Sequence, residues 1–434
     1  MLPSSNSPTS FRTLLATFRL NFTEPSFVTF SALVRGFVAH VGERNVCGML
    51  TGAGLTRLWH HSRAHSFFSQ RRWSADRLGL QFAVLLVQHL LPAGAAIELA
   101  VDDTLFRRSG RKVFGARWCH DGAAKGPRPV GFGNCFIVVG IVIPVPICGR
   151  QVCFPVLFSL WLAGPKVKVA RDLVLRLAER FPGRPIHVTG DAAYISKDLR
   201  HLDAQVSWTT RVRSNACFHD LAPRRTGKRG RPRLRGERLP SITGLTERLH
   251  WSSHTVTRYG HEATVQIAHR TLLWYEPFHT QPVRLVLVRD PGTTTAYDIA
   301  LITTDLAATA VVIVARYASR WSIEVAFEEA KHTTGIGDAR NRTEAAVRRT
   351  VPFGFISQGI LMLWYLTDLH HAGVVEDHRR RAPWYRTKAT PSTADMLLTA
   401  RRVLIAGQFS PRRFAAPTHA EIAAVTHAWE LAAA

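Results

Sequence analysis

Four side chains suited to phosphate chemistry recur at helical spacing in the segment Tyr-Ala-Ser-Arg-Trp-Ser-Ile-Glu-Val-Ala-Phe-Glu-Glu-Ala-Lys, residues 317–331. They are Tyr317, Arg320, Glu324 and Lys331, at intervals of three, four and seven. At about 100° per residue, they fall within an arc of roughly 60° on one helix face. A carboxylate flanked by a guanidinium, an ammonium and a phenol suits the binding of phosphates beside a metal ion. The competing interpretation is a surface helix in which Arg320 and Glu324 form an ordinary ion pair.

Two upstream aspartates extend this pattern. A short apolar strand beginning at Ile97 ends in Asp102 and Asp103, and a second strand, Pro185 to Thr189, leads to Asp191. Phosphodiester chemistry with divalent metals needs acids from separate elements, around two ions about 3.5–4 Å apart. The candidates are Asp103, Asp191 and Glu324, which are 191 − 103 = 88 and 324 − 191 = 133 residues apart. Asp102 and Asp103 point to opposite strand faces, so only one of them can face the metals.

The elements around these acids predict a ribonuclease H-like α/β core. Two buried strands (Asn134 to Val145 and Val152 to Leu162) and an amphipathic helix (Lys166 to Arg180) separate the first aspartate from the second. Five further strand patterns without intervening helices then predict a β-rich insertion over 205–308. An apolar helix, Ala345 to Leu366, follows the Glu324 helix and would complete the core.

The rest of the chain is predicted to be mainly helical. A helix from Ala75 to Leu91 begins after Ser74, a good N-cap, and the preceding helix, Leu55 to Trp73, is rich in Arg and His. That basic face is either solvated or reads the ends of a DNA element. The predicted domains are a helical DNA-end-binding domain (1–93), a ribonuclease H-like core in two parts (94–204 and 309–375), the β-rich insertion with a basic arm (205–308) and a helical C-terminal region (376–434). In the C-terminal region we expect one helix at about Thr393–Ala406 and another that begins at the capping box Thr418-x-x-Glu421.

The charge balance points to a polyanionic partner, because 56 Lys and Arg against 31 Asp and Glu give a net charge of +25. Residues 224–238 concentrate this charge, with eight basic residues and one acid. Within them, Arg229-Gly-Arg231-Pro232 has the form of an AT-hook core, which inserts arginines into a narrow minor groove. We favour a generic phosphate-binding loop over true A·T recognition.

Cysteine usage and hydropathy bear on the compartment. The six cysteines include no C-x-x-C pair, which fits a reducing cytosol. No secretory signal is evident at the N-terminus. The two most apolar stretches, 135–164 and 351–366, are broken by Pro, Gly or polar residues. We therefore interpret them as buried core and expect a cytoplasmic protein that does not use a membrane.

The chain resembles the DDE transposases of bacterial insertion sequences, in the insertion-sequence-four superfamily. Their pattern Y-x2-R-x3-E-x6-K is matched by Tyr317, Arg320, Glu324 and Lys331. The family also places a β-strand insertion between the second aspartate and the glutamate. The run Asp102-Asp103-Thr104, followed by a basic Gly-containing segment, looks closest to the seven-hundred-and-one branch. The resemblance covers about residues 50–370.

The resemblance implies a role for each residue. Asp103, Asp191 and Glu324 would hold two Mg²⁺ ions, for which Mn²⁺ could substitute, and the family's aspartate directly precedes Thr, which favours Asp103 over Asp102. Glu328 and Glu329 are fallbacks for the glutamate, although a solvated acidic helix face suits them better. The side chains expected to contact DNA near the scissile phosphate are Tyr317, Arg320 and Lys331. Trp251 or Trp274 could stack on a flipped base at the transposon end, although each is more often a core aromatic.

The implied function is cut-and-paste DNA transposition. Water attacks the transposon end and frees a 3′-OH, which then attacks target DNA. The implied partners are double-stranded DNA, as terminal inverted repeats and target, and a second copy of the chain on paired ends in a nucleoid-associated complex. The alternatives are a domesticated non-transposing DNA-binding protein and a ribonuclease H-like nuclease. No Walker loop or G-x-S-x-G elbow is present, which argues against ATP use and a serine hydrolase.

Overall fold

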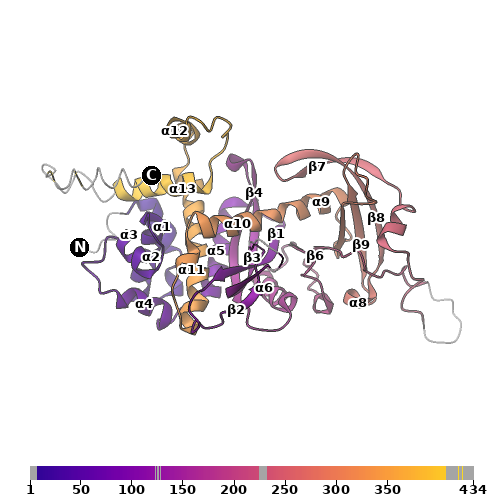
Figure 1. The fold of residues 1–434 in the computed structure, drawn as a ribbon, viewed down its shortest axis with the longest axis horizontal. Helices are drawn as coiled ribbons and strands as arrows, with labels where there is room; N and C mark the ends of the chain where they lie inside the picture. The colour runs from indigo at the N-terminus through magenta and orange to yellow at the C-terminus, as the bar shows by residue number, and fades with distance from the viewer. Residues whose placement is uncertain are drawn as a thin grey trace.

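The computed structural model describes residues 7–406 apart from 123, 125, 126, 128 and 224–231, and beyond these only residues 419 and 423. Helices of the N-terminal region lie at one end of an elongated molecule, a mixed sheet lies in the middle, and further strands lie at the other end (Figure 1). The N-terminal helices are α1 (Thr9–Ala16), α2 (Glu24–Ala39), α3 (Val46–Gly52), α4 (Ser62–Ser69) and α5 (Ala75–Leu90). Short 3-10 turns are η2 (Arg19–Asn21), η3 (Pro146–Cys148), η4 (Lys197–Leu199) and η5 (Ile336–Asp338).

The N-terminal helices follow the sequence pattern with one difference. Helix α5 begins where predicted, because the Ser74 side chain accepts a hydrogen bond of 3.3 Å from the Arg77 amide. The helix predicted from Leu55 to Trp73 is shorter, and only its middle is helical, as α4. Gly54, with φ of 69°, ends the preceding helical turn, and the chain runs through turns before α4 begins.

The central sheet has the topology of a ribonuclease H-like fold. Strand β3 is antiparallel to both β1 and β4, whereas β5 is parallel to β1 and β6 is parallel to β5. Helix α6 (Lys166–Arg180) connects β4 to β5 and has the predicted bounds. This gives the order β4-β3-β1-β5-β6. The strands are β1 (Ile97–Arg107), β3 (Val130–Val145), β4 (Arg150–Leu160), β5 (Ile186–Gly190) and β6 (Val206–Arg211).

One strand was not predicted. Strand β2 (Arg117–His120) lies inside the polar segment after β1 and pairs with the first residues of β3. It has four residues, of which only Cys119 is buried. Its formation depends on the neighbouring β3 edge rather than on a hydrophobic pattern of its own, so the sequence carried no clear signal for it.

The predicted β-rich insertion contains strands that continue the central sheet. Strand β10 is antiparallel to β6, and β9, β8 and β7 follow in order, so the described strands form one ten-stranded sheet. Strand β6, which the sequence analysis assigned to the insertion, belongs to the ribonuclease H-like core because it pairs with β5. The insertion elements are α7 (Ile242–Thr246), β7 (Ser252–Arg258), β8 (His261–Leu273), α8 (Tyr275–Phe278), β9 (Pro282–Arg289) and β10 (Ile299–Thr303).

The helix predicted over 317–331 consists of two consecutive helices that meet at Arg320. Helices α9 (Ala310–Ser319) and α10 (Trp321–His332) run from the insertion strands to the core sheet (Figure 1). Helix α10 packs on β4 and β1, and its apolar residues Ile323, Phe327 and Ala330 are buried as predicted. This packing fixes which face of α10 is turned toward the aspartates of β1.

Helix α11 (Glu344–Trp364) joins the N-terminal helices to the sheet. It packs against α5, α4 and α2 on one side and against β4 on the other, so that both parts share one hydrophobic core. Together with the π-helical turn η6 (Tyr365–Leu369), it is long and apolar enough to cross a membrane, but 89% of its most apolar window is buried in the protein. It is therefore a core helix, as predicted.

The C-terminal region contains α12 (Val374–Arg381) and α13 (Thr393–Ala406), and α13 has the predicted bounds. The helix predicted to begin at Thr418 lies outside the described residues.

Candidate active site

Arg320 bridges an aspartate of β1 and the glutamate of α10. Its Nη1 donates to Asp102 Oδ2 at 3.1 Å, and its Nη2 donates to Glu324 Oε1 at 2.6 Å. The Arg320 side chain is only 11% exposed. The ion pair between Arg320 and Glu324 is therefore no isolated surface pair, because it includes a carboxylate from the middle of the sheet.

Asp191 lies near Asp102 because the strand that precedes it pairs with β1. It directly follows β5, which lies beside β1 in parallel, and its Oδ1 accepts a hydrogen bond of 2.8 Å from the Ala193 amide. Burial raises the pKa of Asp102 to about 7, and the charge of Asp191 adds to this effect although the Arg320 charge opposes it. The structure thus brings Asp102, Asp191 and Glu324 to one region of the sheet.

Asp103 has different partners on the other face of β1. Its Oδ2 accepts from Lys166 Nζ at 2.7 Å and from the Cys135 thiol at 3.3 Å, and its Oδ1 accepts from the Tyr194 hydroxyl at 3.1 Å. Successive strand residues point to opposite faces, which separates Asp103 from Arg320. The prediction that Asp103 is the first metal ligand is not supported by these contacts, which favour the alternative, Asp102.

Tyr194 and Lys166 were not singled out in the sequence. Tyr194 is 1% exposed, and burial together with the charges of Asp103, Asp102 and Asp191 raises its pKa well above the ordinary value. Burial alone would lower the pKa of Lys166, but its bond to Asp103 raises it. The available signal was the position of Tyr194, three residues after Asp191, in a turn that folds back against β1.

Tyr317 and Lys331, the other two residues of the Tyr-Arg-Glu-Lys pattern, lie on either side of the three acids. The Tyr317 ring centre is 5.8 Å from Arg320 Cζ, and burial raises the Tyr317 pKa, with Asp191 adding to the effect. Lys331 Nζ lies 5.7 Å from the centre of the Phe106 ring, near the end of β1. Burial lowers the Lys331 pKa. Tyr317 therefore adjoins the acids, whereas Lys331, near the end of α10, lies beside Phe106, farther along β1 than Asp102.

The acids are not arranged as a closed metal-binding group. Among the described residues, no three His, Cys, Asp or Glu side chains are grouped so that they could hold an ion. The Arg320 guanidinium lies between Asp102 and Glu324 and donates a hydrogen bond to each carboxylate. Carboxylate oxygens from β1, β5 and α10 are nevertheless the hard ligands that Mg²⁺ and Mn²⁺ prefer. In chemical terms, the residues fit divalent cations once Arg320 moves away.

The remaining predicted DNA-contacting residues differ in their surroundings. Trp274 is 8% exposed and packs against Phe218 and Phe278, which favours the alternative of a core aromatic. Trp251 is half-buried, with the Arg289 guanidinium 4.1 Å from its ring centre. Arg229 and Arg231 lie outside the described residues.

The two fallback glutamates of α10 have separate environments. Glu328 is exposed, as expected for a solvated helix face. Glu329 is only 18% exposed and pairs with Arg150 at 3.0 Å. Its predicted solvated role is therefore wrong, because Glu329 joins α10 to the turn between β3 and β4.

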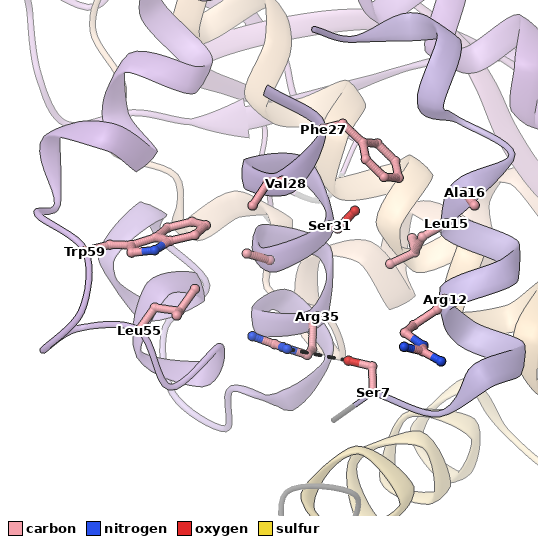
Figure 2. Close-up of a pocket in the computed structure, with 11 residues that line it drawn as sticks. Ser7, Arg12, Leu15, Ala16, Phe27, Val28, Ser31, Arg35, Leu55 and Trp59 are labelled. Atoms are coloured by element: carbon pink, nitrogen blue, oxygen red, sulfur yellow. Dashed lines mark hydrogen bonds between the residues drawn. The ribbon is translucent and has the colours of Figure 1, made fainter. Parts of the chain in front are cut away.

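Two of the hollows in the described surface lie away from the acids. One, of about 220 Å³, lies between α1, α2 and the segment around Trp59, where the buried Arg35 donates to Ser7 Oγ at 3.5 Å (Figure 2). The other is a larger groove of about 850 Å³ along α9 and α10, bounded by the β3–β4 and β7–β8 turns. None of Asp102, Asp191 and Glu324 lines either hollow.

Two parts of the chain match family models of DDE enzymes. Residues 21–166 match the family described as DDE superfamily endonuclease, and residues 165–356 match the Transposase DDE domain. Together these matches span all three acids and support a DDE transposase. No match was found among curated proteins. A solved structure similar to this chain is the piggyBac transposase synaptic complex with hairpin DNA, at 11% identity and a TM-score of 0.39, over 96% of this chain and 81% of that one.

Proposed function

We propose that this protein is a cut-and-paste DNA transposase that hydrolyses phosphodiester bonds at transposon ends and joins the freed 3′-OH to target DNA. The observation that carries the proposal is the shared contact of Arg320 with Asp102 and Glu324, beside Asp191. It connects the spaced pattern on α9 and α10 with acids on two strands of a ribonuclease H-like sheet. The matches to DDE families span these elements.

Asp102, Asp191 and Glu324 would hold two divalent cations, with Mg²⁺ the expected ion. When bound, the cations would activate the attacking oxygen and stabilise the leaving oxygen. The chain's own residues would position the acids: β1 carries Asp102 and pairs in parallel with β5, which Asp191 follows, and α10, which carries Glu324, packs on β1. Lys166 and Tyr194 hold Asp103 and thereby fix the backbone that carries Asp102.

In this proposal, Arg320 also binds a phosphate of the DNA backbone. A guanidinium binds a phosphate as well as it binds a carboxylate, through two parallel donors. An incoming DNA phosphate could therefore draw Arg320 away from Asp102 and Glu324 and leave both carboxylates free for cations. Tyr317 adjoins Arg320 and would contact the same stretch of backbone.

The proposal is tested by incubating the purified protein with a supercoiled plasmid that carries the element's own ends, in Mg²⁺ or in excess chelator. We expect excision of the element and its joining to a second plasmid in Mg²⁺, and neither product in chelator. Cleavage without joining would indicate the nuclease alternative. Specific binding of the ends without cleavage would indicate a DNA-binding protein and would overturn the proposal.

A further inference from the structure

An exposed basic and aromatic segment lies in the C-terminal region, far in sequence from the acids. We call residues 379–386, Arg-Arg-Arg-Ala-Pro-Trp-Tyr-Arg, the basic knob. Trp384 is 81% exposed, more than any other tryptophan among the described residues, and Tyr385 is 52% exposed. The arginines of the knob are exposed as well. Large aromatic side chains that gather in water often mark an interaction site, so we expect this surface to bind a partner.

The knob is held in place by a buried ion-pair network. Lys388 Nζ lies 2.6 Å from Asp395 Oδ2, with side chains only 8% and 4% exposed. His378 Nδ1 lies 3.0 Å from Asp395 Oδ1. Arg379 donates twice to the Lys388 carbonyl, at 3.1 and 2.6 Å. These contacts fix both ends of the loop, so its exposed rings are presented from an ordered backbone and little ordering entropy would oppose binding.

The same loop lies close to α10, the helix that carries Glu324. Gly149, in the β3–β4 turn, is so close to the loop that an added Cβ would lie 3.4 Å from Thr390 Cγ2. The neighbouring Arg150 pairs with Glu329 of α10, five residues after Glu324. One turn thus contacts both the loop of the knob and the helix that carries Glu324. A DNA strand bound at the knob would approach the candidate active site across the β3–β4 turn.

We propose that the basic knob binds an unpaired stretch of DNA, with its arginines on backbone phosphates and Trp384 stacked on an exposed base. Arginines beside aromatic rings suit single strands, because every base offers a π-face and every nucleotide a negative charge. A duplex keeps its bases stacked on one another and gives Trp384 no such partner. The positive charge of the knob disfavours a basic protein surface, including a second copy of this chain. The inference rests on the proposed function, in which cleavage at the element ends produces free strand ends that can leave the duplex.

The inference is tested by fluorescence anisotropy with the full-length protein, a short single-stranded oligonucleotide and a blunt duplex of the same sequence. Trp384→Ala should weaken single-strand binding about tenfold, which corresponds to one lost base stack, and change duplex binding by less than about twofold. Arg380→Ala combined with Arg386→Ala should lower the salt dependence of single-strand binding by about 1.4 in logarithmic slope, at about 0.7 per phosphate.

Two matched variants serve as controls. Trp118→Ala removes another tryptophan, 71% exposed on β2, and Arg176→Ala combined with Arg180→Ala removes two arginines from α6. Both should bind single strands like the wild type. Unchanged single-strand binding by Trp384→Ala, or an equal loss in Trp118→Ala, would overturn the inference. So would a lower oligomeric state of Trp384→Ala, measured by mass photometry, with intact DNA binding, since the knob would then contact protein. A wild type that binds single strands through the knob but never cleaves element ends would refute the proposed function and leave this inference standing.

Discussion

At the scale of single residues, Arg320 bridges Asp102 and Glu324 through its guanidinium. Burial alone would lower its pKa, but the charges of Asp102, Tyr317 and Glu324 raise it above the ordinary value. A metal ion must therefore compete with a guanidinium that is permanently charged. In the proposed function, this competition would make DNA and metal binding cooperative, because a phosphate that takes Arg320 would free the two carboxylates.

The first prediction concerns this coupling. Mn²⁺ binding, measured by electron paramagnetic resonance, should tighten at least about tenfold when element-end DNA is added, since the coupling free energy between two sites is typically 1–3 kcal/mol. Arg320→Ala should bind Mn²⁺ tightly without DNA and yet fail to cleave. Equal Mn²⁺ affinity of the wild type with and without DNA would show that Arg320 does not block the acids.

The second prediction separates the two aspartates of β1. Asp102→Asn should abolish cleavage while the protein stays folded. Asp103→Asn should keep part of the activity but lower the free energy of unfolding by about 1–3 kcal/mol, because the partly buried Lys166 loses its ionic partner. The two quantities are measured by end cleavage and by urea denaturation. An inactive Asp103→Asn beside an active Asp102→Asn would restore the original assignment.

The third prediction concerns pH in metal-free protein. The folded-state pKa of Asp102, about 7, exceeds its ordinary value of 3.8, so the folded state holds the proton more tightly than the unfolded state. The contribution of Asp102 to stability is therefore full below about pH 4 and is lost as the pH rises through about 7. Asp102→Asn should thus be more stable than the wild type at pH 8 and nearly equal to it at pH 4. If Asp102→Asn is more stable than the wild type by the same free energy at both pH values, this account is contradicted.

At the scale of helices and strands, the sequence predicted the elements that carry their own pattern. Helices α6 and α13 have the predicted bounds because apolar spacing and flanking breakers define them. Strand β2 and the pairing of β10 with β6 were not predicted, since both depend on edges supplied by distant segments. The same reason explains the active site: the spaced pattern identified Arg320 and Glu324, but the choice between Asp102 and Asp103 depends on which face of β1 lies under α10.

The fourth prediction tests the packing of α11 on α5. A Cβ on Gly359 would lie 2.4 Å from atoms of the Phe82 ring, which is fully buried. Gly359→Ala should therefore lower the free energy of unfolding by about 1–3 kcal/mol through overpacking. Gly122→Ala is the matched control, because a Cβ there meets nothing within 4 Å. A melting temperature of Gly359→Ala equal to that of the control would show that the two helices are not packed as described.

At the scale of the whole molecule, the net charge of +25 is that of a protein that binds a long polyanion. The proposed active site is partly buried and small, so most of the phosphate contacts must come from elsewhere on the chain. The basic knob and the arm at 224–238 are two candidates. The arm was predicted from charge and a short motif, and residues 224–231 of it lie outside the described part of the chain.

The fifth prediction concerns this arm. Arg229→Ala combined with Arg231→Ala should weaken duplex binding uniformly across sequences and lower the salt slope by about 1.8, at about 0.9 per phosphate contact. The affinity should be measured from low to physiological salt. A slope equal to that of the wild type would mean that the arm does not touch DNA.

The central claim is that Asp102, Asp191 and Glu324 act together on DNA, and Glu324→Gln tests it most directly. The neighbouring Glu328→Gln, an exposed residue of the same helix, is the matched control. With element-end DNA and Mg²⁺, Glu324→Gln should bind the ends with near wild-type affinity and cleave none of them, whereas Glu328→Gln should cleave normally. Cleavage by Glu324→Gln at the wild-type rate would contradict the account.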